Sequence, residues 1–205
     1  MKLSILIPTH NRPKLFRRCL ESVLKQLPEN VEVIVNNDSY DIKEIKHKQV
    51  KYFYYKSSNL ADIYKFLLDK SKGDFCYFLE DDDYLLDNFF SKIKYKNSIY
   101  VFIPHSGIKN YFKIKDLFKD RLTIKTYNKI LEELKEPFQF SQIIFSSKFK
   151  NLLPNDNNIH NDFLFFKKML EYEDFEIINK PIFQQTCDAG DNISFPDLNK
   201  DLRFE

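Results

Sequence analysis

Glycine, cysteine and tryptophan are scarce in this chain, whose 205 residues contain three Gly, three Cys and no Trp. The cysteines, Cys19, Cys76 and Cys187, are far apart and odd in number. They fit neither a disulfide framework nor a Cys-x-x-Cys metal site. We therefore expect a protein of a reducing compartment, and we predict a cytoplasmic location.

Long apolar runs and basic blocks are also missing. No run approaches the roughly 20 apolar residues that cross a bilayer, and the apolar start MKLSILIPTH is too short for a signal peptide. Lys and Arg are dispersed along a chain of net charge +2, which argues against nucleic acid as a partner. We expect a soluble protein with no transmembrane segment, for which peripheral membrane contact stays open.

The residues that are present predict a folded α/β protein. The chain is 43% hydrophobic and 30% charged, which is enough apolar sequence for a sizeable core. In the first hundred residues, short apolar runs alternate with segments of helical apolar spacing. This alternation predicts a parallel sheet with right-handed crossovers. The predicted strands are Leu3–Ile7, which Pro8 ends, Val31–Val35, Val50–Tyr55 and Asp74–Leu79. Helices are predicted from Arg12, with Asn11 as the cap, and from Leu60.

The second hundred residues are less regular. Strands are predicted at Ser98–Ile103 and Phe138–Phe145, and helical pieces at Lys115–Lys119 and Tyr127–Leu134. A longer helix is predicted at Asn161–Tyr172, and the side chains expected to face the core are Phe163, Phe166, Leu170 and Met169. No repeat or linker interrupts the chain, so residues 1–205 are predicted to form a single domain.

Four consecutive acids, Glu80–Asp83, follow directly after the predicted strand Asp74–Leu79. Ligands of open parallel sheets bind beyond the carboxyl ends of the strands. The segments PTHNR and NNDS also follow strand ends, so the three polar segments are predicted to meet at one rim. A solvated loop with surplus charge is the alternative. Carboxylate oxygens suit Mg²⁺ or Mn²⁺, which completes its shell with waters and substrate phosphates.

At this point the sequence resembles the GT-A glycosyltransferases of family 2. The matching segments are SILIPTHNRPKLFRRCLESVLKQ, VEVIVNNDS, KGDFCYFLEDDDYL and NDFLFFKKMLEYEDFEIINKPI, with a closing DNIS. They follow the family order and cover most of the chain to about Ser194. The resemblance implies a GT-A fold, with a Rossmann-like, mostly parallel central sheet flanked by helices. It implies a nucleotide-sugar-binding half at about 1–103 and an acceptor-binding half at about 104–205.

The resemblance also implies a nucleotide and metal site. Pro8, Thr9 and Asn11 are expected to line the nucleotide beside the first strand. Asp81 is expected nearer the ribose, and Asp82 is expected to be the ligand of Mn²⁺ or Mg²⁺. In such a site the metal bridges the diphosphate and offsets the charge that develops on the leaving group.

One acid further along the chain matches the general base of inverting members. Asp162 stands at the start of a predicted helix, and Asn161 replaces the Glu that the family often has before it. A general base accepts the proton of the acceptor hydroxyl. An Asp at a helix N-terminus is also favoured by capping and by the helix dipole alone. His160 is a candidate to tune that base.

Three other matches are partial. NNDS stands where the family commonly has Asp-Asp-Gly-Ser, so Asp38, or else Asn36 or Asn37, is expected to contact the base and ribose, unless the segment is a plain turn. Asn59 fits a family Asn but equally fits a helix cap. The family's closing His is absent, and the candidate substitutes are Asp188, Asp191 and His105.

We therefore predict a metal-dependent, inverting glycosyltransferase. Its donor is a nucleotide diphospho-sugar, with UDP favoured over GDP or dTDP, and its acceptor is the hydroxyl of a glycan or a lipid-linked molecule. A sugar-1-phosphate nucleotidylyltransferase has a related sheet but needs a Gly-rich loop after the first strand, where PTHNRP has no Gly. A non-catalytic nucleotide-sugar or glycan binding module is the alternative, because the closing His and some acids are missing.

Overall fold

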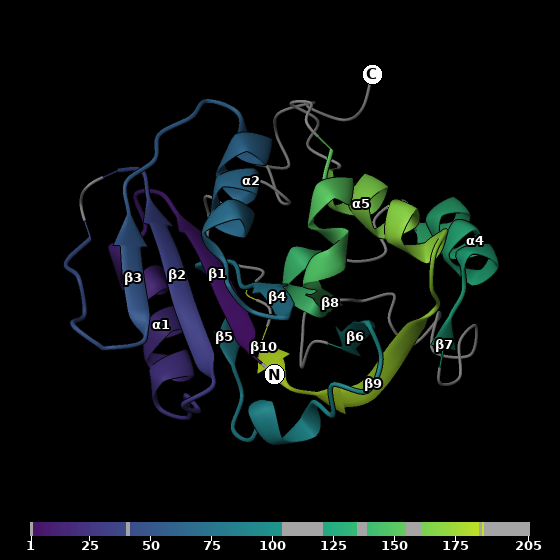
Figure 1. The fold of residues 1–205 in the computed structure, drawn as a ribbon, viewed down its shortest axis with the longest axis horizontal. Helices are drawn as coiled ribbons and strands as arrows, with labels where there is room; N and C mark the ends of the chain where they lie inside the picture. The colour runs from purple at the N-terminus through teal and green to yellow at the C-terminus, as the bar shows by residue number, and fades with distance from the viewer. Residues whose placement is uncertain are drawn as a thin grey trace.

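A computed structural model describes residues 2–39, 42–103, 121–134, 139–154, 161–184 and 186. Within these residues an eight-stranded sheet has the order β3-β2-β1-β4-β8-β6-β9-β7 (Figure 1). Its strands are β1 (Leu3–Thr9), β2 (Val31–Asn37), β3 (Val50–Phe53), β4 (Phe75–Phe78), β6 (Ile99–Ile103), β7 (Arg121–Leu122), β8 (Ile143–Ser146) and β9 (Phe175–Pro181). Strands from both predicted halves of the chain therefore share one sheet.

The sheet is mostly parallel, as predicted. Strands β1 to β4 run parallel to one another, and β6 runs parallel to β9. Strand β8 is antiparallel to both β4 and β6, and β7 is antiparallel to β9. The order reverses at β1, which pairs with β2 on one side and β4 on the other. The carboxyl ends of β1 and β4 are therefore the switch point where ligands of such sheets bind.

Helices cover both faces of the sheet because the central strands are apolar on both sides. They are α1 (Pro13–Leu24), α2 (Leu60–Lys70), α4 (Ile124–Leu134) and α5 (Asn161–Leu170). One core cluster joins Leu6 and Phe78 to buried residues of α2, α4 and α5. The other joins Ile5 and Tyr77 to α1 and to Phe183 of a small second sheet, in which β5 (Tyr84–Leu85) pairs with β10 (Phe183–Gln184).

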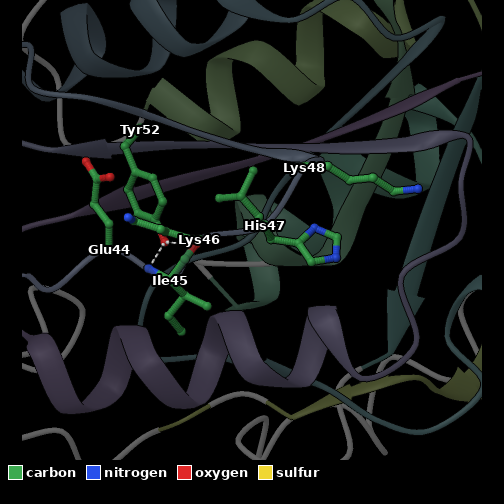
Figure 2. Close-up of a pocket in the computed structure, with 7 residues that line it drawn as sticks. Glu44, Ile45, Lys46, His47, Lys48 and Tyr52 are labelled. Atoms are coloured by element: carbon green, nitrogen blue, oxygen red, sulfur yellow. Dashed lines mark hydrogen bonds between the residues drawn. The ribbon is translucent and has the colours of Figure 1, made fainter.

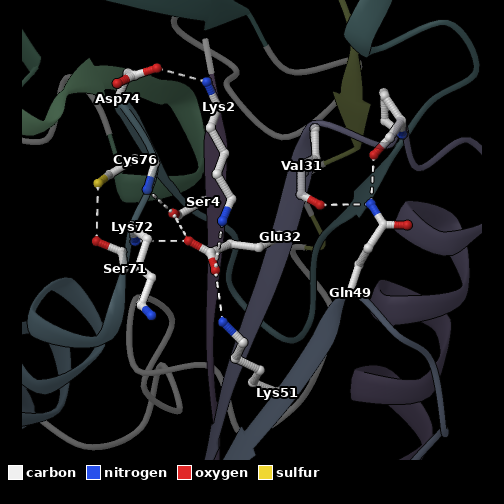
Figure 3. Close-up of polar contacts among 12 residues, drawn as sticks. Lys2, Ser4, Val31, Glu32, Gln49, Lys51, Ser71, Lys72, Asp74 and Cys76 are labelled. Atoms are coloured by element: carbon white, nitrogen blue, oxygen red, sulfur yellow. Dashed lines mark hydrogen bonds and ion pairs between the residues drawn. The ribbon is translucent and has the colours of Figure 1, made fainter.

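Buried polar contacts tie the strands together at their amino ends (Figure 3). Glu32, in β2, is 4% exposed. Its carboxylate accepts hydrogen bonds from the Ser4 hydroxyl at 2.7 Å, the Lys72 N–H at 2.8 Å and Lys51 Nζ at 3.1 Å. Lys2 Nζ lies 3.3 Å from the same group. The network joins the starts of β1, β2 and β4, and so fixes their register.

Several predicted boundaries were wrong at the starts and ends of elements. Pro8 does not end β1, which pairs with β2 as far as Thr9, although its pairing with β4 stops at Leu6. The missing N–H of a proline costs little near the end of a strand. Asn11 does not cap α1: it has a φ of 53°, and Arg12 is the cap residue.

The predicted strand Phe138–Phe145 was also wrong in part. Residues Phe140–Gln142 form the 3₁₀ turn η3, and β8 begins only at Ile143. In α5 the buried side chains include Phe165, whereas Phe163 is only half-buried. The 3₁₀ elements η1 (Phe90–Lys92) and η4 (Ser147–Leu152) were not predicted. The predicted helical piece Lys115–Lys119 lies outside the described residues.

Candidate functional site

The four acids lie in a loop that follows β4, at the switch point of the sheet. Asp81, Asp82 and Asp83 are only 4%, 5% and 2% exposed, and Glu80 is half-buried. Solvated loop acids are exposed, so the alternative of a solvated acidic loop is wrong. Buried carboxylates need hydrogen-bond or charged partners, which other segments supply here.

Thr9, the last residue of β1, and Arg12, in the turn before α1, contact Asp81 and Asp82. Thr9 Oγ1 donates to Asp81 Oδ2 at 2.7 Å. Arg12 Nη1 donates to Asp81 Oδ1 at 3.1 Å and to Asp82 Oδ2 at 3.4 Å. The predicted meeting of PTHNR with the acids is confirmed. Arg12 is the last residue of the PTHNR segment, but no role was predicted for it.

Asp83 and Asp82 are connected to Thr186, at the end of the described chain, by hydrogen bonds. The Thr186 N–H donates to Asp83 Oδ1 at 2.9 Å. Arg18 Nη2 donates to the Asp82 carbonyl and, at 2.8 Å, to Thr186 Oγ1. The Arg18 guanidinium also lies 4.8 Å from the ring centroid of Tyr84. No sequence signal connected residues so far apart.

Glu80 faces the second half of the protein. Its carboxylate accepts a hydrogen bond from Tyr64 Oη in α2 at 2.9 Å, and its N–H donates to Ser141 Oγ at 3.1 Å. Burial, the charge of Glu80 and the charge of Asp162 all raise the pKa of Tyr64. Asp162 lies in the first turn of α5 and is half-buried.

Burial also makes this loop a poor place for several negative charges. Burial raises the pKa of Asp81 to about 6, although the hydrogen bond from Thr9 and the charge of Arg12 both lower it. Burial and the charge of Asp82 raise the pKa of Asp83 to about 7 and that of Glu80 well above its ordinary value. A positive charge close to these carboxyl groups would therefore favour their ionised forms.

The third polar segment, NNDS, lies against the first. His10 Nδ1 lies 2.5 Å from Asp38 Oδ1, and the Asn11 N–H donates to Ser39 Oγ at 2.9 Å. Asn37 ends β2, is 1% exposed and accepts a hydrogen bond from the Ser39 hydroxyl at 3.0 Å. All three predicted segments therefore meet at one rim.

The remaining predicted residues have mixed surroundings. Pro8 is buried in β1, and Asn11 is exposed. Asn59 is the cap of α2, where its side chain accepts a hydrogen bond from the Ala61 N–H at 2.9 Å. The helix-cap interpretation of Asn59 is thus confirmed, while its contact with a nucleotide stays a prediction. His105, His160, Asp188 and Asp191 lie outside the described residues.

A divalent cation needs several oxygen ligands, which protein, water and substrate supply together. In the described ranges, no three His, Cys, Asp or Glu side chains form a group that could hold a metal by themselves. Asp81 and Asp82 nevertheless offer two buried carboxylates side by side, and Mg²⁺ typically takes one or two carboxylates with waters and substrate phosphates. The residues therefore fit part of a metal shell that a diphosphate completes.

A pocket of about 470 Å³ lies elsewhere, beside the β2–β3 loop (Figure 2). Glu44, Lys46, Lys48, Val50 and Tyr52 are among its lining residues. Val50 is the first residue of β3, whereas the acid loop follows the last residue of β4. Because β3 and β4 point the same way, this pocket is not at the rim that gathers the polar segments.

A mostly parallel sheet with buried acids at its switch point is an open α/β architecture, whose ligands bind at this edge of the sheet. The model of the family described as "Glycosyl transferase family 2" matches residues 4–170. The chain belongs to this family. The match includes β1 from Ser4 onward, the acid loop and Asp162.

Curated relatives match part of the chain. It is 38% identical over 94 residues to an uncharacterized glycosyltransferase of Rickettsia bellii, covering 42% of this chain and 14% of that protein. It is 33% identical over 106 residues to the GalNAc(5)-diNAcBac-PP-undecaprenol beta-1,3-glucosyltransferase of Campylobacter jejuni, covering 46% of this chain and 34% of that enzyme. The matched part of the chain thus spans about a third or less of the length of either relative.

The fold is similar to solved structures of TarS from S. aureus. TarS 1–349 in complex with UDP-GlcNAc gives a TM-score of 0.68 at 19% identity, covering 95% of this chain and 61% of that one. At this identity the likeness shows the fold alone, and it confirms the predicted GT-A architecture. No helix in the described part of the chain has the length and apolarity needed to cross a bilayer.

Proposed function

We propose that the chain transfers a sugar from a nucleotide diphospho-sugar to an acceptor hydroxyl, with inversion at the anomeric carbon. The observation that carries the proposal is the buried Asp81–Asp82 pair at the switch point, held by Thr9 and Arg12. Membership of glycosyl transferase family 2 supports the same reaction class. Burial raises the pKa of Asp81 to about 6, and a strongly shifted carboxyl at a ligand-binding edge is a candidate for a functional site.

Each end of the donor has residues suited to it. Asp81 and the β2 end, with Asn37 and Asp38, would position the nucleoside, and Pro8 and Thr9 would line the same site. Asp82, beside Asp81, would hold Mn²⁺ or Mg²⁺. When bound, such an ion supplies Lewis-acid stabilisation of the departing nucleoside diphosphate. The bound cation would also offset the cost of burying these carboxylates.

Asp162 is the proposed general base. It would take the proton of the acceptor hydroxyl while that oxygen attacks the anomeric carbon and the nucleoside diphosphate leaves. Its support is its place in the first turn of α5, within electrostatic reach of Tyr64, which itself bonds to Glu80. Asp162 belongs to the second half of the sequence, where the acceptor is expected to bind.

The relatives narrow the proposed substrates. The UDP-GlcNAc and UDP complexes of TarS favour a UDP-sugar as donor. The name of the Campylobacter jejuni enzyme favours a lipid-linked glycan as acceptor. A cytoplasmic location also stays a proposal, supported by the buried free thiols of Cys19 and Cys76.

The decisive experiment uses UDP-sugars with MnCl₂ and measures UDP release together with UDP binding. We expect the wild-type protein to bind UDP more tightly with Mn²⁺ than without it. We also expect it to release UDP slowly from at least one of the UDP-sugars. Asp82→Asn should lose the effect of Mn²⁺ on binding. Asp162→Asn should keep binding and lose transfer about 10²-fold or more, the range of general-base removal.

Asp87→Asn is the matched control, because Asp87 is a strongly exposed acid of the same loop region that pairs with Lys25. It should behave as the wild type. Binding without any turnover of any UDP-sugar would instead support the non-catalytic binding module. Full transfer by Asp162→Asn would contradict the assignment of the base.

A further inference from the structure

Arg12 has an unusual position for a helix-cap residue. Its carbonyl accepts the first hydrogen bond of α1, from the Phe16 N–H at 2.9 Å. Its side chain turns back to the acid loop, and only 17% of that side chain is exposed. One nitrogen, Nη1, donates to an oxygen of Asp81 and to an oxygen of Asp82. The guanidinium therefore bridges the two carboxylates.

The bridge lies where a shared cation would bind. Thr9 fixes the second oxygen of Asp81 at 2.7 Å, so this carboxylate presents its Oδ1 to Arg12 in a defined direction. Arg18, the other arginine at the loop, donates instead to the Asp82 carbonyl and to the Thr186 hydroxyl. Arg12 is thus the arginine whose charge rests on carboxylate oxygens.

A guanidinium and a divalent cation cannot share these oxygens at close range. Mg²⁺ binds oxygen at roughly 2.0–2.1 Å and excludes other cationic groups from the same lone pairs. The repulsion is strong because the acids are buried and poorly screened. Either Arg12 moves when the metal arrives, or the metal binds weakly.

We propose that Arg12 is a built-in counter-ion, which a divalent cation displaces from Asp81 and Asp82 and which then binds the donor diphosphate. This extends, and rests on, the proposed function. The positive charge of Arg12 compensates the carboxylates of Asp81 and Asp82 and opposes the binding of metal alone. Metal and nucleotide are then taken up together, because the diphosphate offers the displaced guanidinium new oxygen partners.

The test measures Mn²⁺ binding without nucleotide, by the loss of the spectrum of free Mn²⁺ in electron paramagnetic resonance. Arg12→Gln should bind Mn²⁺ about tenfold more tightly than the wild type, since it loses the competing charge-assisted hydrogen bonds. Arg12→Lys keeps the charge but not the fork of donors, and should give an intermediate affinity. With saturating Mn²⁺, Arg12→Gln should bind UDP about tenfold more weakly.

Arg17→Gln is the matched control, with the same change of charge on the same helix. Arg17 is mostly exposed and pairs with Glu21 in the next turn, so its loss should leave Mn²⁺ and UDP affinities unchanged. Circular dichroism and thermal unfolding of each variant report whether it folds. If Arg12→Gln does not fold, the proposal is tested with Arg12→Lys instead. A folded Arg12→Lys variant with the Mn²⁺ affinity of the wild type would overturn the proposal.

An unchanged or weaker Mn²⁺ affinity in a folded Arg12→Gln variant would also overturn it, because Arg12 would then be a permanent brace. That result leaves the proposed function intact if the wild type still binds UDP with Mn²⁺ and turns over a UDP-sugar. Failure of the wild type to bind any nucleotide would instead defeat the proposed function. Mn²⁺ titration without nucleotide separates the two cases.

Discussion

The backbone N–H of Thr186 donates a hydrogen bond to Asp83 Oδ1 at 2.9 Å, although the two residues are 103 positions apart. Arg18 strengthens the same junction, because it donates to the Thr186 hydroxyl and to the Asp82 carbonyl. The pairing of β10 with β5 brings this part of the chain beside the acid loop. The end of the described chain thus helps to hold the acids in place.

Arg18→Gln should loosen this junction. The variant loses its charge-assisted contacts with the Asp82 carbonyl and Thr186, and we expect a loss of about 1 kcal/mol in the free energy of unfolding. UDP binding with Mn²⁺ should weaken as the loop becomes less ordered. Urea unfolding and UDP titration measure the two effects, and a fully wild-type variant would show that the junction contributes nothing.

Glu32→Gln should remove a pH-dependent part of the stability. Burial alone raises the pKa of Glu32, but hydrogen bonds from Ser4, Lys72, Lys51 and Lys2 lower it from 4.5 to about 2. The ionised form is therefore favoured in the folded state. Its stabilisation is present above pH 4.5 and is lost as the pH falls towards 2.

The expected size is about 2 kcal/mol, less than the full shift implies, because water screens Lys2 and Lys51. Unfolding free energies of the wild type and of Glu32→Gln, measured between pH 2 and 7, should approach each other at the acid end. Glu29→Gln, at an exposed site next to β2, is the control. Parallel pH curves for the wild type and Glu32→Gln would refute this role for the carboxylate.

Gly73→Ala should destabilise the amino end of β4. A Cβ at this position would lie 2.7 Å from the Ser4 nitrogen, the Phe75 oxygen and Ser4 Oγ. Two of these atoms belong to the backbone and cannot turn away, so we expect a loss of about 2 kcal/mol or more. The double variant Ser4→Ala/Gly73→Ala removes the side-chain clash only, and its thermal unfolding should reveal no rescue. Rescue would place the clash at the hydroxyl.

Asn36→Asp should cost stability even though it restores the acid that the family commonly has. Asn36 is 1% exposed, donates to the Tyr55 carbonyl and accepts from the Tyr55 N–H, each at 2.9 Å. A carboxylate cannot donate, so a buried acceptor loses its partner, at a cost of about 1–3 kcal/mol. Asn37→Asp keeps the acceptor that Ser39 uses and should cost less. Equal losses in urea unfolding would contradict this explanation.

The local pattern of the chain predicted most of the sheet and its rim. Apolar runs such as Val31–Val35 were sufficient to predict strands, and the apolar spacing of α1 was sufficient to predict a helix, because burial alone produces these patterns. Alternation of strands and helices implied parallel strands, and therefore a common edge for Thr9, Asp38 and Asp81. Boundaries failed where pairing decided them, as when β2 extended to Asn37 beside Thr9.

The amino-acid sequence by itself determined the strand–helix order, the acids after β4 and the family motifs. These are properties of neighbouring residues, fixed by periodicity and by local backbone preference. Only the tertiary structure decided which charges the acids meet. Arg12 bridges Asp81 and Asp82 and Thr186 reaches Asp83, because loop geometry and the β5–β10 pairing bring distant side chains together. Contacts between residues so far apart have no local signature.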